Sequence, residues 1–151
     1  MLSQMLYIST AVGPVTTAVT GTILRSAQAH NAANGITGVL CQGQGIYLQV
    51  LEGERSQIDA LYARIVLDKR HHKVTLRQQT EISQRRYGKW AMAHVDLAHV
   101  TSLAQPTSDG STKAHPAQAL GFDPYTASGE QVMATMDQLI ALGKVMNAPV
   151  V

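Results

Sequence analysis

The sequence predicts an α+β domain with a ferredoxin-like β-α-β-β-α-β-β layout over residues 1–97, followed by a C-terminal helical extension over residues 98–151. Three observations lead to this prediction: two segments with helical hydrophobic periodicity, several apolar runs of strand length, and a glycine-rich connection typical of a hairpin. The chain has 151 residues, 45% of them hydrophobic, which suffices for one domain with a buried core. We expect both helices on one face of the sheet.

The first strand and the first helix are separated by a Gly-Pro pair. Residues 5–9 form a short apolar, partly β-branched run, which predicts a strand. Pro14 follows at the position expected for the first residue of a helix, where its missing N–H is not needed. Apolar side chains then recur every four residues and predict an amphipathic helix: Val15, Val19, Ile23 and Ala27. Asn34-Gly35 has the composition of a left-handed C-cap for this helix.

A hairpin and a second helix come next. Residues 36–41 and 46–51 are apolar runs on either side of a four-residue connection with two glycines, which predicts an antiparallel hairpin. The clearest helical spacing in the chain follows, with apolar residues at i, i+3, i+4, i+7 and i+8: Ile58, Leu61, Tyr62, Ile65 and Val66. Glu52 and Glu54 near its start suit the helix dipole. Residues 74–82 and 90–95 predict the last two strands.

The composition changes after residue 97. Three of the five prolines, Pro106, Pro116 and Pro124, lie in a stretch that predicts a loop. Apolar residues at near-helical spacing then predict a last helix from about residue 129 to residue 147. This helix either covers the sheet face that the first two helices leave open or pairs with another protomer. In both cases we expect it to relay a signal, and we expect a homo-oligomer.

Charge and composition exclude several classes of protein. The chain carries 12 basic and 10 acidic residues, a net charge of +2, without a basic stripe interleaved with aromatics. This argues against a nucleic-acid partner. No apolar run approaches the ~18 residues of a membrane span, and the N-terminus lacks the basic and apolar regions of a signal peptide, so we expect a cytoplasmic protein without a membrane partner. The single cysteine, Cys41, forms no intrachain disulfide, and we expect no metal site.

Three polar residues fall where apolar ones are expected. Gln49 stands in a strand that is apolar on both faces, Tyr7 lies in the first strand, and Asn31 continues the buried stripe of the first helix. Each has an ordinary explanation: a buried amide or phenol bonded to a neighbour, or a helix cap. Together, however, they would converge between the sheet and the helix as a polar pocket in an apolar layer, the usual form of a small-ligand site.

The end of the second helix carries charged residues that are open to two interpretations. Arg64 and Asp68, one turn apart, form either a solvated ion pair or part of the pocket. The cluster Arg70-His71-His72 either compensates the helix dipole or contacts the phosphates of a ligand. No nucleophile or phosphate-loop motif is present, so the sequence gives no support for an enzyme.

An ordered set of sequence blocks resembles BLUF domains, the flavin-binding blue-light sensors. The blocks run without an evident gap through residues 1–97: Met5-Leu6-Tyr7-Ile8-Ser9, residues 30–40, residues 47–54, residues 64–72 and Trp90-Ala91-Met92. Any one of them alone is weak, whereas the ordered set is specific. The tail resembles that of short, stand-alone members of the family.

The resemblance implies a flavin between the two helices, FAD with FMN as the alternative. The residues that would hold it are Ile23 and Ile65 against the ring faces, Asn31, Arg64 and Asp68 at the pyrimidine edge, His30 and Gln49 as further cofactor contacts, and His71 with Arg70 and His72 at the phosphates. By the same resemblance, Tyr7 and Gln49 match the photoactive pair, and Trp90 and Met92 match the strand that relays the signal.

We therefore expect a blue-light photoreceptor without enzymatic output of its own. An excited flavin is a strong oxidant, a phenol can give up an electron and a proton, and an amide can exchange its donor and acceptor ends. Output would pass through a protein partner or through self-assembly. The alternative is a flavin-free ferredoxin-like ligand-binding or interaction module, and a small flavin reductase is a third reading of the same pocket.

Overall fold

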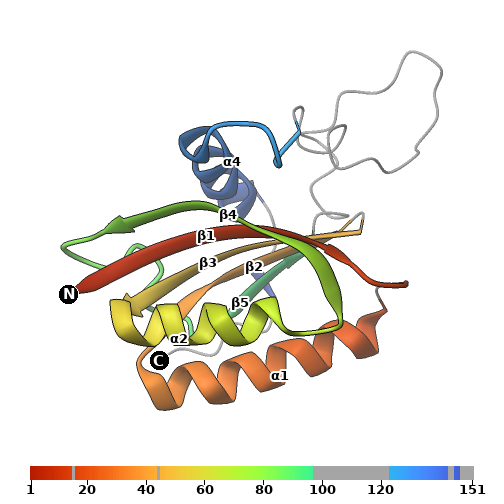
Figure 1. Cartoon of the computed structure of the whole chain (residues 1–151), viewed down its shortest axis with the longest axis horizontal. Helices are drawn as coiled ribbons and strands as arrows, with labels where there is room; N and C mark the ends of the chain where they lie inside the picture. Colours follow the sequence, from red (N-terminus) through yellow and green to blue (C-terminus); the bar gives the residue numbers. More distant parts are fainter. Residues whose placement is uncertain (15, 44, 97–122, 143–144, 147–151) are drawn as a thin grey trace.

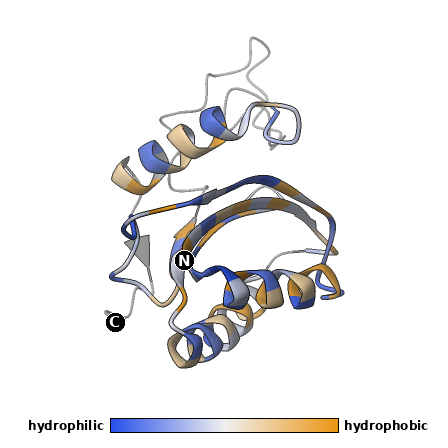
Figure 2. Cartoon of the chain, turned by 60° about the vertical axis from the view of Figure 1, so that its left-hand side comes forward, coloured by the Kyte–Doolittle hydropathy of each residue, from blue (hydrophilic) through white to orange (hydrophobic). Residues whose placement is uncertain are grey.

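The computed structural model describes residues 1–14, 16–43, 45–96, 123–142 and 145–146. Within them the chain forms one mixed sheet in the order β4-β1-β3-β2-β5-β6. Helices α1 and α2 lie on one face of this sheet and α4 lies on the other (Figures 1 and 2). The elements are β1 Leu2–Ala11, α1 Thr17–Asn34, β2 Thr37–Gly43, β3 Ile46–Glu54, α2 Arg55–Val66, β4 His71–Glu81, β5 Ala93–Asp96, α4 Gly129–Leu142 and β6 Val145–Met146.

The strand pairing confirms the predicted α+β class and element order. β2 and β3 form the expected antiparallel hairpin, and β1 pairs antiparallel with both β3 and β4. β5 joins the other side of the sheet parallel to β2. In the β1–β3 register Tyr7 faces Gln49 directly, so two of the three polar candidates lie side by side at the centre of the sheet.

The C-cap of α1 is confirmed, but its predicted start is wrong. Gly35 has φ 65°, in the left-handed region, and its N–H bonds to the Asn31 carbonyl. At the other end Thr16 is the N-cap, because its hydroxyl accepts a hydrogen bond from the Val19 N–H at 3.2 Å. Pro14 therefore precedes the cap instead of occupying the first helical position. A threonine at the N-cap stabilises the start of the helix because its hydroxyl accepts a hydrogen bond from a free backbone N–H. Proline only lacks an N–H, so it determines the start of the helix less strongly.

The second helix ends at the last residue of its apolar stripe. α2 stops at Val66, and β4 begins at His71 rather than at residue 74. Glu54 is the N-cap residue but makes no side-chain cap bond; its carboxylate pairs instead with the Met1 amino group at 2.7 Å. Glu52 lies in β3 and does not serve the helix.

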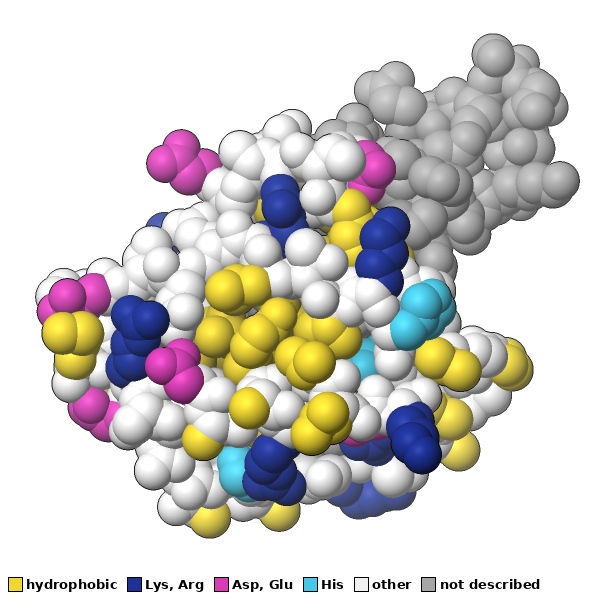
Figure 3. Space-filling view, viewed as in Figure 1, with side chains coloured by type: hydrophobic (Ala, Val, Ile, Leu, Met, Phe, Trp, Pro, Cys, Tyr) yellow, Lys and Arg dark blue, Asp and Glu magenta, His cyan; other side chains and the backbone are white. Residues whose placement is uncertain are grey.

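β4 is an edge strand of the described sheet. Among the described residues it pairs only with β1, and its Leu76 is 41% exposed. Figure 3, which shows the side of the molecule where β4 lies in front, has apolar side chains gathered at its centre, below α4 and above α2. An exposed apolar patch of this kind is a feature of association surfaces.

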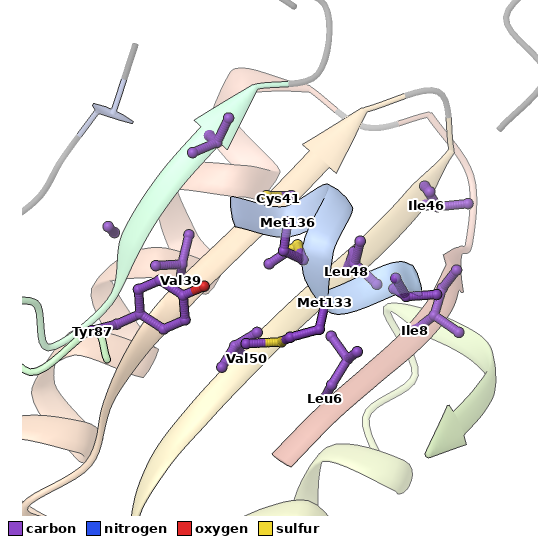
Figure 4. Close-up of a cluster of buried hydrophobic side chains, with 13 residues drawn as sticks. Leu6, Ile8, Val39, Cys41, Ile46, Leu48, Val50, Tyr87, Met133 and Met136 are labelled. Carbon is purple, nitrogen blue, oxygen red and sulfur yellow. The ribbon is translucent and has the colours of Figure 1, made fainter. Parts of the chain in front are cut away.

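The sheet is buried on both faces, as predicted for the strand that carries Gln49. On one face a cluster that includes Tyr7, Leu24, Leu51 and Met92 packs under α1 and α2. On the opposite face α4 inserts Val132, Met133 and Met136 into a second cluster with β1, β2, β3 and β5 (Figure 4): Leu6, Ile8, Val39, Cys41, Ile46, Leu48, Val50, Ala93 and Val95. Of the two placements considered for the last helix, coverage of the open sheet face is the one that the structure shows.

The end of the chain departs from the prediction in one respect. α4 ends at Leu142, and Val145–Met146 form β6, which pairs antiparallel with β5, so the expected helix to residue 147 is wrong. An extended segment there pairs backbone groups of β5 that a longer helix would leave without a strand partner. The strand expected at residues 90–95 begins only at Ala93. The predicted loop with Pro106 and Pro116 lies outside the described residues.

Candidate functional site

A cavity lies between α1, α2 and the sheet. It is lined by all nine residues that the sequence singled out as photochemical or ligand-binding: Tyr7, Ile23, His30, Asn31, Gln49, Arg64, Ile65, Asp68 and His71. They come from β1, α1, β3, α2, the turn after α2 and the first residue of β4. The convergence expected from strand alternation and from the helical stripes is therefore present in the folded chain.

Tyr7 and Gln49 form a buried hydrogen-bonded pair. The Tyr7 hydroxyl donates to Gln49 Oε1, and Gln49 Nε2 lies 3.2 Å from the sulfur of Met92. Both residues are at most 5% exposed. Burial holds the pKa of Tyr7 well above its usual value, so the phenol is neutral and donates its proton throughout the physiological range. The acceptor end of the amide thus faces the phenol, and its donor end faces the sulfur.

Asn31 presents an unsatisfied acceptor to the cavity. Its Nδ2 donates to the Ala91 carbonyl at 2.8 Å, which fixes the orientation of the amide. Its Oδ1 is buried and has no hydrogen-bond partner among the described residues. A buried acceptor without a partner costs about 1–3 kcal/mol, which a ligand N–H can recover. The side chain does not cap its helix, so the cap interpretation is wrong, and the cavity fits a ligand with an imide-type N–H, as a flavin has.

The expected ion pair between Arg64 and Asp68 is absent. Because α2 ends at Val66, Asp68 lies beyond the helix and the i,i+4 geometry is lost. Asp68 instead accepts four hydrogen bonds from Arg70, three from its side chain and one from its backbone N–H at 2.9 Å, and these lower the pKa of its carboxyl group. Arg64 Nη1 lies 3.0 Å from His30 Nδ1. Arg64 and His30 are thereby brought together at the mouth of the cavity.

His71 forms part of the cavity wall. Its Nδ1 lies 2.7 Å from Ser9 Oγ and its Nε2 lies 2.6 Å from the Ile65 carbonyl. Since a carbonyl can only accept, Nε2 carries a proton. Both ring nitrogens are engaged within the protein, which favours a positioning role over contact with a ligand phosphate. His72 is exposed.

The two residues predicted as a relay lie on opposite faces of the sheet. Met92 is fully buried in the cluster under α1 and α2, in contact with Gln49. Trp90 packs against the second cluster, on the side of α4, and its carbonyl accepts the Gly38 N–H at 3.0 Å. Of the two, Met92 is therefore the residue beside the Tyr7–Gln49 pair.

Sequence reasoning did not assign three further residues of this region. Tyr47 lines the cavity, and strand alternation could have found it, because it shares a face of β3 with Gln49. The Tyr62 ring packs 5.9 Å from that of Tyr7. Gln28 donates from α1 to the Met92 carbonyl at 3.0 Å. Nothing in the local sequence around Gln28 indicates this contact, because it joins residues 64 positions apart.

The geometry defines a class of site: a cavity for a planar ring with an imide edge, next to a phenol–amide pair that can move a proton. The family model described as BLUF, sensors of blue-light using FAD, matches residues 2–93. The chain belongs to this family of blue-light sensors, whose chromophore is a flavin. The match favours the photosensor over a flavin-free module or a flavin reductase.

Similar proteins agree with this assignment. The photoactivated adenylate cyclase subunit beta of Euglena gracilis is 35% identical over 92 residues, 60% of this chain and 11% of that protein. The dark-state structure of BlrB, a BLUF protein, is 26% identical with a TM-score of 0.73, covering 93% of this chain and 95% of BlrB. The ground state of BlsA, at 24% identity and a TM-score of 0.73, shares the fold and covers 98% of this chain and 94% of that one.

This chain thus spans about a tenth of the length of the Euglena cyclase subunit that it matches. Within the described ranges, no helix is long and apolar enough to cross a membrane. The same part of the chain holds no group of three or more His, Cys, Asp or Glu side chains arranged to bind a metal ion.

Proposed function

We propose that the Tyr7–Gln49 pair is the photochemical centre of this sensor. The bound flavin supplies absorption of blue light and, once excited, a strong oxidant. Tyr7 would pass one electron to the excited ring, and its hydroxyl proton would pass to the same ring by way of the hydrogen bond to Gln49 Oε1. When electron and proton return, Gln49 is left with its amide rearranged, so that hydrogen bonding around the ring changes without a covalent bond being made. The hydrogen-bonded chain Tyr7–Gln49–Met92 in the cavity wall is the observation that carries this proposal.

The other cavity residues would hold the ring. Ile23 and Ile65 would pack on its faces, and the unpaired Asn31 Oδ1 would accept its imide N–H. Arg64, which lies beside His30, would donate to a ring carbonyl. Asp68 and His71 would position other residues. Asp68 would hold the Arg70 side chain in place, and His71 would connect Ser9 of β1 to the Ile65 carbonyl of α2.

We further propose that residues 1–97 act as the sensor and residues 98–151 as the output extension, in a cytoplasmic protein. No catalytic step is assigned to this chain, and its output would pass to a partner protein or through self-association. The apolar patch beside the edge strand β4 supports an association surface (Figure 3). We accordingly expect a homo-oligomer.

The absorption spectrum of the purified chain loaded with FAD or FMN tests the photochemical function. Blue light should shift the flavin band to longer wavelength, and the shift should decay fully in darkness. Cys41 lies on the opposite face of the sheet, and burial raises the pKa of its thiol to about 12, so it should form no adduct with the flavin. Cys41→Ala should cycle normally. A protein that binds flavin but shows no reversible shift would contradict the proposal, as would a Cys41→Ala variant that no longer cycles.

A further inference from the structure

Polar contacts attach helix α4 to the rest of the fold at two distinct places. The first lies just before the helix, at the edge of the sheet, where Tyr125 Oη and Thr10 Oγ1 are 2.5 Å apart and Arg77 donates to the Ala127 carbonyl. Gly129, the first residue of α4, approaches β4 so closely that a Cβ there would lie 2.7 Å from the Arg77 carbonyl oxygen. This attachment joins α4 to strands of the sheet itself.

The second attachment lies in the middle of the helix, at Asp137. The Tyr87 hydroxyl donates to Asp137 Oδ1, and Arg86 Nη1 donates to Oδ2 at 2.9 Å. Arg86 and Asp137 are half-exposed, so their ion pair alone contributes little. Tyr87, in contrast, is 6% exposed and lies with its ring against the second cluster (Figure 4). This attachment joins α4 to the segment between β4 and β5.

A buried carboxylate holds the near end of that segment. Glu52 is completely buried, and its two oxygens accept the backbone N–H groups of Tyr87 at 2.6 Å and Arg86 at 3.0 Å, together with the side-chain amide of Gln4. Within the described chain no Lys or Arg side chain forms an ion pair with it. Glu52 lies three positions after Gln49 on β3, so the segment is hydrogen-bonded to the strand that carries the photochemical amide.

The far end of the segment is held at the flavin cavity. Gln28 and Asn31 of α1 donate to the carbonyls of Met92 and Ala91, respectively, and Gln49 Nε2 contacts the Met92 sulfur. In this orientation the amide donates to the sulfur. If the amide rearranges, its carbonyl oxygen faces the sulfur instead, and this donor is lost. The segment between β4 and β5 is hydrogen-bonded near both of its ends. A displacement of Met92 can therefore move Tyr87 and Arg86 more readily than it could if the segment were unattached.

We propose that Asp137 is the residue through which the state of the Tyr7–Gln49 pair reaches α4, by way of Met92 and the side chains of Arg86 and Tyr87. The inference rests on the proposed photochemical function and assigns its output to a particular contact. In the lit state the hydrogen bonds from Tyr87 and Arg86 to Asp137 weaken. The first attachment, through Tyr125 and Arg77, persists. Because coupling between two sites is reciprocal in free energy, weakening the hydrogen bonds to Asp137 also changes the free-energy difference between the dark and lit states, and we expect the dark recovery to change with it.

Another route leads from the cavity to α4, and the test must separate the two. β5 begins directly after Met92 and pairs with β6, which follows α4. A signal carried by this strand pair would bypass Asp137. The chain offers a matched set of variants. Tyr87→Phe removes one hydrogen bond of the second attachment and Asp137→Asn removes its charge, whereas Tyr125→Phe removes the same hydroxyl group from the first.

The experiment uses the full flavin-loaded chain and measures the red shift, its dark recovery, and hydrogen exchange of the α4 amides in darkness and under blue light. In the wild type, α4 exchange should rise in light. In Tyr87→Phe and Asp137→Asn it should already be raised in darkness by about 2- to 10-fold, the light-dependent difference should disappear, and dark recovery should change by a similar factor. Tyr125→Phe should keep both the light-dependent difference and the wild-type recovery rate.

Two results would overturn the inference while leaving the photochemical function intact. One is a wild-type light-dependent difference in α4 that survives in Asp137→Asn, which would assign the signal to the β5–β6 route. The other is a normal red shift without any change in α4 exchange. A wild-type protein without a red shift would instead contradict the proposed function itself, and the inference with it.

Discussion

The two faces of the sheet are built from the same strands but differ in kind. In β3, Ile46, Leu48 and Val50 point into a cluster of aliphatic and methionine side chains under α4. The residues between and after them, Tyr47, Gln49 and Leu51, point toward α1 and α2, where a cavity holds polar groups. One face is a packed core whose contacts contribute to stability. The other has an amide that can exchange hydrogen bonds, so the alternation of side chains along β3 separates the packed core from the proposed photochemical site.

Of the substitutions considered, truncation of Leu48 should have the largest effect. It should lower the stability of the packed face under α4 and leave the cavity face unchanged. The residue is fully buried in the cluster under α4, and Leu48→Ala should lower the free energy of unfolding by about 2–5 kcal/mol. Chemical denaturation of the flavin-loaded protein measures this change. The red shift per bound flavin should remain that of the wild type. A lost red shift in a variant that is still folded would break the separation between the two faces.

Truncating Asn31 should act on the other face and on binding. Asn31→Ala removes the buried acceptor at the cavity, and flavin affinity should fall by about 5- to 150-fold, which corresponds to about 1–3 kcal/mol. Titration of the flavin-free protein with FAD measures the change. Asn34→Ala is the control, because Asn34 donates only to a carbonyl of its own helix. Equal losses in the two variants would show that the effect comes from helix stability.

Substitution of Gln28 should have a smaller effect, confined to the rate of dark recovery. Gln28→Ala removes the hydrogen bond to the Met92 carbonyl without removing a cavity-lining side chain. The rate of dark recovery should change by about 2- to 10-fold, while flavin affinity stays within about twofold of the wild type. Flash photolysis gives the rate. A variant with wild-type recovery would show that the position of Met92 does not depend on this bond.

The pH dependence should be the smallest effect. Because burial raises the pKa of Tyr7 above its usual value of 10.0, the phenol stays protonated in the folded protein, and the red shift should be constant between about pH 6 and about pH 9. The unfolded chain loses this proton near its ordinary pKa. The associated stability is therefore present below about pH 10 and declines as the pH rises further. A red shift that falls with a midpoint below about pH 9 would contradict a buried, neutral Tyr7.

Local sequence patterns were sufficient to predict which residues face the cavity. They were not sufficient to predict the contacts that these residues make with distant parts of the chain. The alternation of β3 and the stripe of α1 bring Tyr7, Gln49 and Asn31 together, as predicted. The partner of Asp68 was not predictable, since it depends on where α2 ends, and the apolar stripe runs up to that point without a stop signal. The opposite placement of Trp90 and Met92 depends on β5 beginning only at Ala93. β6 and the carboxylate of Glu52 have no local signature, because their partners lie far away in the sequence.

Adjacent residues of β1 allow the most direct test of the account. Tyr7 faces the cavity and Ile8 the cluster under α4, so Tyr7→Phe and Ile8→Val each remove one small group from opposite faces. The measurement is the light-minus-dark absorption spectrum of both flavin-loaded variants beside the wild type. Tyr7→Phe should bind flavin and show no red shift, whereas Ile8→Val should show the full shift with a stability loss of about 0.5–1.5 kcal/mol. A full red shift in Tyr7→Phe would contradict the assignment of Tyr7 as the electron donor.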